Sequence, residues 1–226
     1  MAQRPIFIPQ SNPRQLVLEP MVTFEWHPGM ALSQKQKSIR ALHQSAGLAG
    51  PLLEVSSKSE NPLGRALSAF NLSLRSEAGL SAPVECFFQG SKQFRQGGPF
   101  TDLYQARPID AKRDERLKVS GDLQAFVFSG MAWPLQPQSA FYDWLYLNAL
   151  QQQPRLMEAV QGFAAFTDIE FNPKVSINCQ ARSVALCVAL HQSSLFEDAL
   201  RSPTAFLDQL GLAHRVARPF QQSFGF

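Results

Sequence analysis

The residues best suited to chemistry lie between positions 58 and 94, in the stretch KSENPLGRALSAFNLSLRSEAGLSAPVECFFQGSKQF. A helical pattern from Val84 onward places Glu85, Gln89 and Lys92 at i, i+4 and i+7, so that they share one face. A carboxylate, an amide and an amine on one stripe could line a polar pocket, where burial and neighbouring charges tune such groups for catalysis. The same stripe is equally typical of a solvated helix surface.

A bend precedes this helix and is predicted to be held between two strands. Asn61 and Gly64 provide its turn chemistry, and the backbone amides of such a bend can face outward. A short strand over residues 52–57 would deliver Lys58 to the bend, and alternating apolar residues over 70–74 predict a second strand. A bend anchored on both sides is what a binding loop needs.

The helix starts are also predicted from local pattern. Ser81 is the expected N-cap of the helix that begins near Val84. Ser139 is expected to begin an aromatic helix that contains Tyr142 and Trp144. A phenol or indole tip needs a polar partner when it is buried. The pattern is therefore equally consistent with one aromatic facing a pocket and with interior packing.

Two segments further along the chain carry polar candidates. Residues 166–171 alternate like a strand that exposes Asp168 and Glu170. Asn178 is a candidate cap for the apolar helix that follows, and its amide-rich entry with Arg182 resembles an anion-binding helix N-terminus. Capping accounts for Asn178 but not for Arg182, which favours a functional role for the arginine.

The composition limits the number of domains and the kinds of partner that we expect. With 226 residues, of which 45% are hydrophobic and 17% charged, the chain can form one domain with a substantial core. The formal charge of +3 permits a nucleic-acid partner without specifying one, because binding depends on a basic patch rather than on the total. The mixed-charge run from Lys112 to Lys118 is predicted to be a solvated helix.

Cysteine usage and hydropathy indicate the compartment in which the protein works. Cys86, Cys179 and Cys187 are odd in number and lack paired spacing, which indicates a reducing compartment and predicts neither a disulfide framework nor a metal site. No apolar run reaches transmembrane length and the N-terminus lacks a signal-peptide core. We therefore expect a cytoplasmic protein with no membrane partner.

Several stretches carry a resemblance to a known family. NPLGRALSAFN resembles the glycine-then-LSNF signature of the NADAR (YbiA-like) superfamily, and VECFFQGSKQF resembles its VEhyYQaqKF helix. FYDWLYLNAL is similar to a later helix of that family. FEWHPGMALSQKQKSI and FTDIEFNPKVSINCQARS resemble the subgroup paired with DarT, a toxin that ADP-ribosylates DNA. The resemblance covers roughly residues 4 to 195.

The resemblance implies an activity. NADAR proteins are glycosidases of N-glycosidic bonds, and the DarT-paired subgroup resembles an antitoxin that removes ADP-ribose from guanine in DNA. It implies hydrolysis without a cofactor, on a modified base that is single-stranded or flipped out, since a base inside a duplex is shielded. ADP-ribose would be the product, and the cognate DarT-like toxin is a candidate partner.

The resemblance also implies roles for residues. Glu85 matches the family's glutamate and would shuttle protons and stabilise developing positive charge. Lys58 matches a family lysine and would either form a Schiff base or bind phosphate and ribose. The expected ligand-binding residues are Asn61, Gly64, Arg65, Ser68, Phe70, Gln89, Lys92, Tyr142 or Trp144, Asp168, Asn178 and Arg182.

This chain departs from the broad family at two places, and two rival functions stay open. Ala69 stands where LSNF has asparagine, and INCQARS replaces a later aspartate–tryptophan–glycine motif, which weakens the assignment of residues 168–182. One rival is an N-glycosidase of riboflavin-pathway intermediates. The other is a non-catalytic module that binds ADP-ribose or sequesters the toxin.

The expected architecture is a single α+β domain, mainly helical, with a small sheet to which N-terminal strands are added. Residues 1–50 are expected to form a strand–helix extension packed on the same domain. Residues 51–212 would form the NADAR-like glycohydrolase domain, and residues 213–226 a C-terminal tail.

Overall fold

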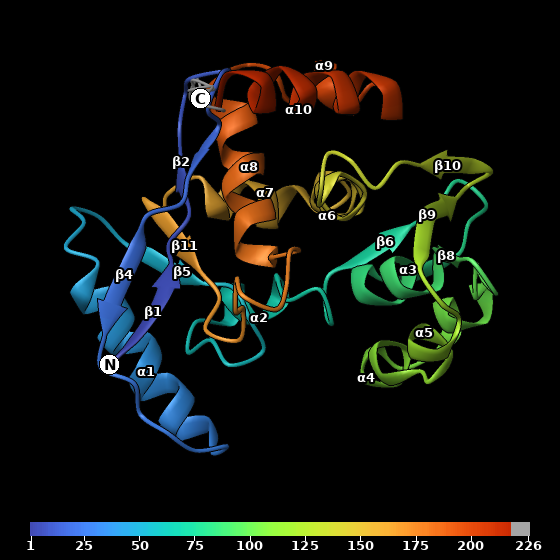
Figure 1. Cartoon of the computed structure of the whole chain (residues 1–226). Coiled ribbons are helices and arrows are strands. Elements are labelled where there is room, and N and C mark those ends of the chain that lie inside the picture. The colour runs from blue at the N-terminus through green and yellow to red at the C-terminus, as the bar shows by residue number, and fades with distance from the viewer. Residues whose placement is uncertain (218–226) are drawn as a thin grey trace, which may run out of the picture.

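A computed structural model describes residues 1–217, which fold into many short elements (Figure 1). The helices are α1 (Leu32–Ser45), α2 (Pro62–Ala66), α3 (Val84–Gly90), η1 (Thr101–Gln105), α4 (Pro108–Arg113), α5 (Arg116–Val119), α6 (Ala140–Gln151), α7 (Pro154–Val160), α8 (Gln180–Gln192), α9 (Phe196–Leu200) and α10 (Pro203–Ala217). The strands are β1 (Ala2–Pro5), β2 (Ile8–Pro9), β3 (Val17–Leu18), β4 (Met21–Phe24), β5 (Leu52–Glu54), β6 (Ser73–Arg75), β7 (Ser81–Pro83), β8 (Lys92–Phe94), β9 (Leu123–Phe128), β10 (Met131–Trp133) and β11 (Ala165–Thr167). The predicted tail extends beyond the described residues.

The strands form small separate sheets, and the predicted α+β class is confirmed. The largest sheet within residues 1–217 is antiparallel and has the order β10-β9-β8. The other strands pair as β1-β4, β2-β3, β6-β7 and β11-β5, and only the last of these pairs is parallel. No described helix combines the length and the apolar character that a bilayer crossing needs.

Two helices, α6 and α8, form the centre of the molecule. Nine residues of each helix are buried, which explains why neither shows a clear polar face. In Figure 1, α8 runs through the middle of the molecule, with α9 and α10 across one of its ends. The hydroxyl of Tyr146 on α6 donates to the carbonyl of Leu67, so the central helix also holds the chain just after α2.

The parallel pairing of β5 with β11 brings the turns that follow these two strands close together. Glu54 lies beside Thr167 in the register, and Val55 donates its N–H to the Thr167 carbonyl at 2.8 Å. Because parallel strands end at the same edge, the turn after β5 and the turn after β11 emerge together. Phe7 bridges Phe166 with backbone bonds of 2.8 and 2.9 Å, which joins the N-terminal segment to the same layer.

The structure corrects the predicted cap and the predicted end of the helix that carries Glu85. The helix does begin at Val84, but Ser81 lies in β7 and makes no cap. The helix also ends at Gly90, so Lys92 is not on its face. Lys92 instead pairs with Phe126 in the ladder between β8 and β9, because strand pairing there satisfies backbone groups that a longer helix would have used.

Three further local predictions are also corrected. The predicted bend contains the short helix α2, whose first turn is capped by the Asn61 side chain accepting from the Leu63 N–H at 2.9 Å. The predicted strand over 166–171 ends at Thr167, and Asp168 is buried rather than exposed. Asn178 does not cap α8, since Cys179 occupies that position without a side-chain bond.

Candidate active site

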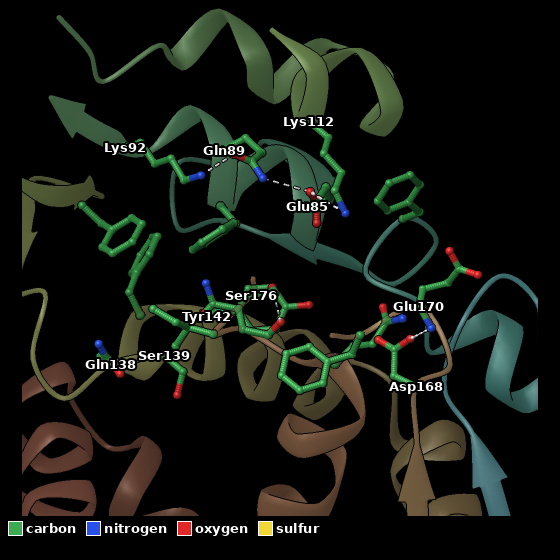
Figure 2. A pocket seen from close by; sticks show the side chains of 18 of the residues that line it. Glu85, Gln89, Lys92, Lys112, Gln138, Ser139, Tyr142, Asp168, Glu170 and Ser176 are labelled. Atoms are coloured by element: carbon green, nitrogen blue, oxygen red, sulfur yellow. Dashed lines mark hydrogen bonds and ion pairs between the residues drawn. The ribbon is translucent and has the colours of Figure 1, made fainter. Parts of the chain in front are cut away.

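A cavity of about 1020 Å³ brings most of the predicted site residues together. One wall comes from α3, β8 and α4, and the other from the turns after β5 and β11 and the segment that leads into α6 (Figure 2). The predicted residues that line it are Lys58, Ser68, Phe70, Glu85, Gln89, Lys92, Tyr142, Asp168 and Asn178. Five other predicted residues, Asn61, Gly64, Arg65, Trp144 and Arg182, do not line it.

Glu85 is buried in the cavity wall, with only 6% of its surface exposed. It lies in the first turn of α3, and its backbone N–H donates to the Ala69 carbonyl at 3.0 Å. Its Oε1 accepts a hydrogen bond from Gln89 Nε2 at 3.0 Å and lies 4.0 Å from Lys112 Nζ. Among the described residues these polar side-chain contacts all reach Oε1, which leaves Oε2 available to a ligand.

Lys92 fixes the orientation of the Gln89 amide. Its Nζ donates to Gln89 Oε1 at 2.7 Å, so the Gln89 NH₂ group must face Glu85. Burial lowers the pKa of Lys92 from 10.5 to about 8, the charge of Glu85 opposes this shift, and Lys112 adds to it. The ammonium also lies 4.8 Å from the centre of the Phe88 ring. Figure 2 shows Lys92, Gln89 and Glu85 in one row along the wall.

Lys58 lies on a turn that hydrogen bonds connect, through Ser56, to the buried carboxyl group of Glu54. The Lys58 N–H donates to Ser56 Oγ at 3.1 Å, and Ser56 Oγ donates to Glu54 Oε1 at 2.7 Å. Glu54 also accepts from the Thr167 hydroxyl at 2.6 Å and from the Ile169 N–H at 2.9 Å. The turn is therefore fixed by a satisfied buried polar network, in which each buried polar group has a partner.

Asp168 is a second buried carboxyl group, and it faces the cavity. Its Oδ1 accepts the Glu170 N–H at 3.0 Å, and burial raises its pKa, with the Lys112 charge acting in the opposite direction. Burial and the nearness of Asp168 likewise raise the pKa of Glu54. The pair therefore favours a protonated carboxyl group over two adjacent negative charges. Gln180, which also lines the cavity, accepts the Ala69 N–H at 2.8 Å.

Tyr142 lies on the wall opposite the Glu85 row (Figure 2). The centres of the Tyr142 and Phe88 rings lie 5.1 Å apart in an edge-to-face arrangement, and the Tyr142 hydroxyl makes no hydrogen bond within the described part of the chain. Burial raises the pKa of Tyr142, and the charge of Glu85 raises it further. The phenol therefore stays protonated and can donate to a ligand in the cavity.

Trp144 and Arg182 serve packing and ion pairing instead of lining the cavity. The Trp144 ring lies 5.3 Å from Trp133 and 5.5 Å from Phe206. Arg182 donates to Asp143 Oδ2 at 2.9 Å and to Glu19 Oε1 at 2.8 Å. The Arg182 guanidinium, which was expected to bind an anion of the ligand, is thus paired with the carboxylates of Asp143 and Glu19.

Asn61, Gly64 and Arg65 lie outside the cavity, at the start of α2 or within it, and they shape the backbone next to the Lys58 turn. A Cβ on Gly64 would lie 1.9 Å from the Glu54 carbonyl oxygen, so only glycine fits between α2 and β5. Arg65 Nη1 donates to the carbonyls of Ser59 and Glu60 at 2.8 and 2.9 Å. With the Asn61 cap, these contacts give the motif a role in shaping the backbone.

Lys112 is the most important site residue that sequence reasoning missed. It lies on α4, in the segment predicted to be solvated, and its Nζ approaches both Glu85 Oε1 and the Phe70 ring, the latter at 5.4 Å. No local pattern marks it, because its role depends on α4 packing beside α3. Ser56 and Gln180 also line the cavity and were not predicted, although Gln180 lies in the amide-rich entry to α8.

Comparison with known proteins identifies a family. The family model described as "DarT1-associated NADAR antitoxin" matches residues 2–218. No curated protein matches the chain.

Proposed function

Because the chain belongs to the DarT1-associated NADAR antitoxin family, we propose that it is a glycohydrolase that removes ADP-ribose from guanine bases in DNA. The observation that carries this proposal is the convergence of Glu85 and Lys58 on one cavity, although 27 positions separate them in the chain. A buried carboxylate can act as the acid and base in cleavage of an N-glycosidic bond, and an amine at the same site can either attack the sugar or bind the ligand.

Glu85 is proposed as the acid–base residue. The bond to be broken joins the anomeric carbon of the ribose to the exocyclic amine of guanine. As it breaks, positive charge develops on the sugar and the amine must gain a proton. Glu85 Oε2 is available for this transfer, while Oε1 accepts from Gln89 and lies 4.0 Å from Lys112 Nζ. A carboxyl group positioned in this way contributes about 10²–10⁴-fold to the rate.

Lys58 has two possible roles, and one measurement separates them. In the covalent route, the Lys58 amine attacks the ring-opened anomeric carbon, guanine leaves with a proton, and water then hydrolyses the resulting imine. In the direct route, water attacks and Lys58 only binds the ligand. Borohydride reduction during turnover followed by peptide mass spectrometry yields an ADP-ribose adduct on Lys58 only in the covalent route.

The rest of the cavity suits ADP-ribose. Phe70 and the Tyr142 ring supply apolar surface for a base or sugar, and Lys92 and Lys112 supply positive charge for the diphosphate. The volume of about 1020 Å³ lies at the upper end of the roughly 300–1,000 Å³ of ligand pockets. The ligand would therefore fit together with the base to which it is attached.

The test is hydrolysis of guanine-ADP-ribosylated single-stranded DNA by the purified protein and by Glu85→Gln. We expect the wild type to release ADP-ribose and the variant to lose about 10²–10⁴-fold in kcat. Calorimetric binding of ADP-ribose by the variant shows that the cavity is intact. A phosphoribosyl metabolite serves as the comparison substrate.

Cell protection distinguishes catalysis from sequestration. If Glu85→Gln protects cells from the toxin as well as the wild type does, the protein acts by binding. Absence of hydrolysis by the wild type would likewise contradict the proposed activity.

A further inference from the structure

Exposed aliphatic side chains gather at the mouth of the cavity. Ile109, Leu135, Val175 and Ile177 all line it and are all exposed, Val175 by 81% and Ile177 by 55%. They come from three separate parts of the chain: helix α4, the segment before α6, and the segment before α8. Large aliphatic side chains from three segments that meet at one opening mark an interaction surface.

Positive charge accompanies this apolar surface. Arg113 follows Ile109 by one turn of α4, and it lines the same cavity. Within the described residues, neither Arg113 nor Lys58 forms an ion pair. The nearby carboxylate of Glu170 is engaged by Lys35 at 3.1 Å. The mouth therefore offers cations that are not neutralised, beside apolar contacts.

The proposed reaction constrains what passes this mouth. A modified guanine enters the cavity while it is still attached to its strand, so the neighbouring nucleotides must lie across the opening. Those nucleotides carry phosphates and bases with apolar faces. Single-strand binding sites recognise the phosphates with cations and the bases with aromatic side chains, and pockets for flipped bases also pack apolar side chains against the base.

We propose that the rim formed by Ile109, Arg113, Leu135, Val175 and Ile177 binds the nucleotides that flank the modified base in a single DNA strand. The proposal rests on the proposed function and names the part of the substrate beyond ADP-ribose. Arg113 contacts a phosphate, and the aliphatic residues cover the faces of bases or sugars.

The test compares two substrates, ADP-ribosylated guanosine and an ADP-ribosylated single-stranded oligonucleotide. The rim variants are Val175→Ser combined with Ile177→Ser, and Arg113→Gln. The matched controls are Met30→Ser and Lys37→Gln, which replace an exposed apolar residue and an exposed cation that do not line the cavity. We expect the rim variants to raise the KM for the oligonucleotide about tenfold more than the KM for the nucleoside.

Binding of an unmodified strand tests the rim independently of catalysis. Fluorescence anisotropy with a labelled single-stranded oligonucleotide should show weaker binding by both rim variants and unchanged binding by both controls. Arg113→Gln should also reduce the slope of log K against log salt by about one.

The outcomes separate the two proposals. Hydrolysis of neither substrate by the wild type would refute the proposed function, and the anisotropy measurement would still decide the rim. Equal losses on both substrates, or unchanged oligonucleotide binding, would overturn the rim proposal. Rim variants that lose only binding to the purified toxin would overturn it in favour of a protein partner.

Discussion

Gln89 donates its side-chain N–H to Glu85 Oε1 at 3.0 Å, and it can do so in only one orientation of its amide. The oxygen of the same amide, Oε1, accepts from Lys92 Nζ at 2.7 Å. Exchanging the nitrogen and the oxygen by a flip of the amide would therefore break both hydrogen bonds. Gln89 on the helix thus holds the proposed acid–base carboxylate by one oxygen, and Lys92 on the adjoining strand fixes Gln89 in turn.

Replacing Gln89 should weaken catalysis without unfolding the protein. In Gln89→Leu, Glu85 loses a hydrogen bond to a charged group worth about 1.5–3 kcal/mol, so we expect kcat to fall at least about tenfold. The measurement is kcat on ADP-ribosylated DNA together with thermal unfolding. Gln96→Leu, at an exposed amide outside the cavity, is the control. An unchanged kcat would show that Glu85 does not need this bond.

Lys92 should make stability rise with pH in a defined window. Its pKa is about 8 in the folded protein against 10.5 when exposed, so between these values the unfolded state binds more protons. The free energy of unfolding of the wild type should therefore increase, relative to Lys92→Met, as the pH rises from about 8 to 10.5. Urea unfolding across this range measures it. Lys118→Met, at an exposed lysine, should follow the wild type, and parallel curves for Lys92→Met would contradict the prediction.

Gly64 should tolerate no side chain. An added methyl group would overlap the Glu54 carbonyl oxygen at 1.9 Å and Ser59 Oγ at 2.4 Å, so α2 must move away from β5. We expect Gly64→Ala to lower the free energy of unfolding by about 3 kcal/mol. Gly162→Ala, where nothing lies within 4 Å, should change it by less than about 0.5 kcal/mol. Equal effects of the two substitutions would rule out the packing explanation.

Arg182 should contribute to stability through Asp143. Arg182→Met leaves the Asp143 carboxyl group buried without its cation, and we expect a loss of about 3–5 kcal/mol in the free energy of unfolding. Adding Asp143→Leu should recover part of that loss, because both charged partners are then absent. A raised KM in Arg182→Met with unchanged stability would instead indicate that the arginine binds substrate.

The local motifs were predicted well because they depend on short-range chemistry. The start of α3 at Val84 and the position of Glu85 in its first turn follow from an apolar pattern and a turn. The ends of elements were predicted less well. Lys92 lies in a strand and not in the predicted helix because β8 pairs with β9. Ser81 lies in a strand and not at a helix cap because β7 pairs with β6. Such pairings involve residues that are distant in the chain and carry no local signal.

By itself the sequence determined the family and the α+β class, and nine of its fourteen predicted site residues line the cavity. Only the tertiary structure decided which groups surround Glu85. Lys112 reaches it because α4 packs beside α3, and Asp168 is buried near Glu54 because β5 and β11 pair in parallel and end at one edge. Arg182 is bound to Asp143 because α6 and α8 pack together. A residue's charge partners depend on distances through space, which periodicity along the chain does not specify.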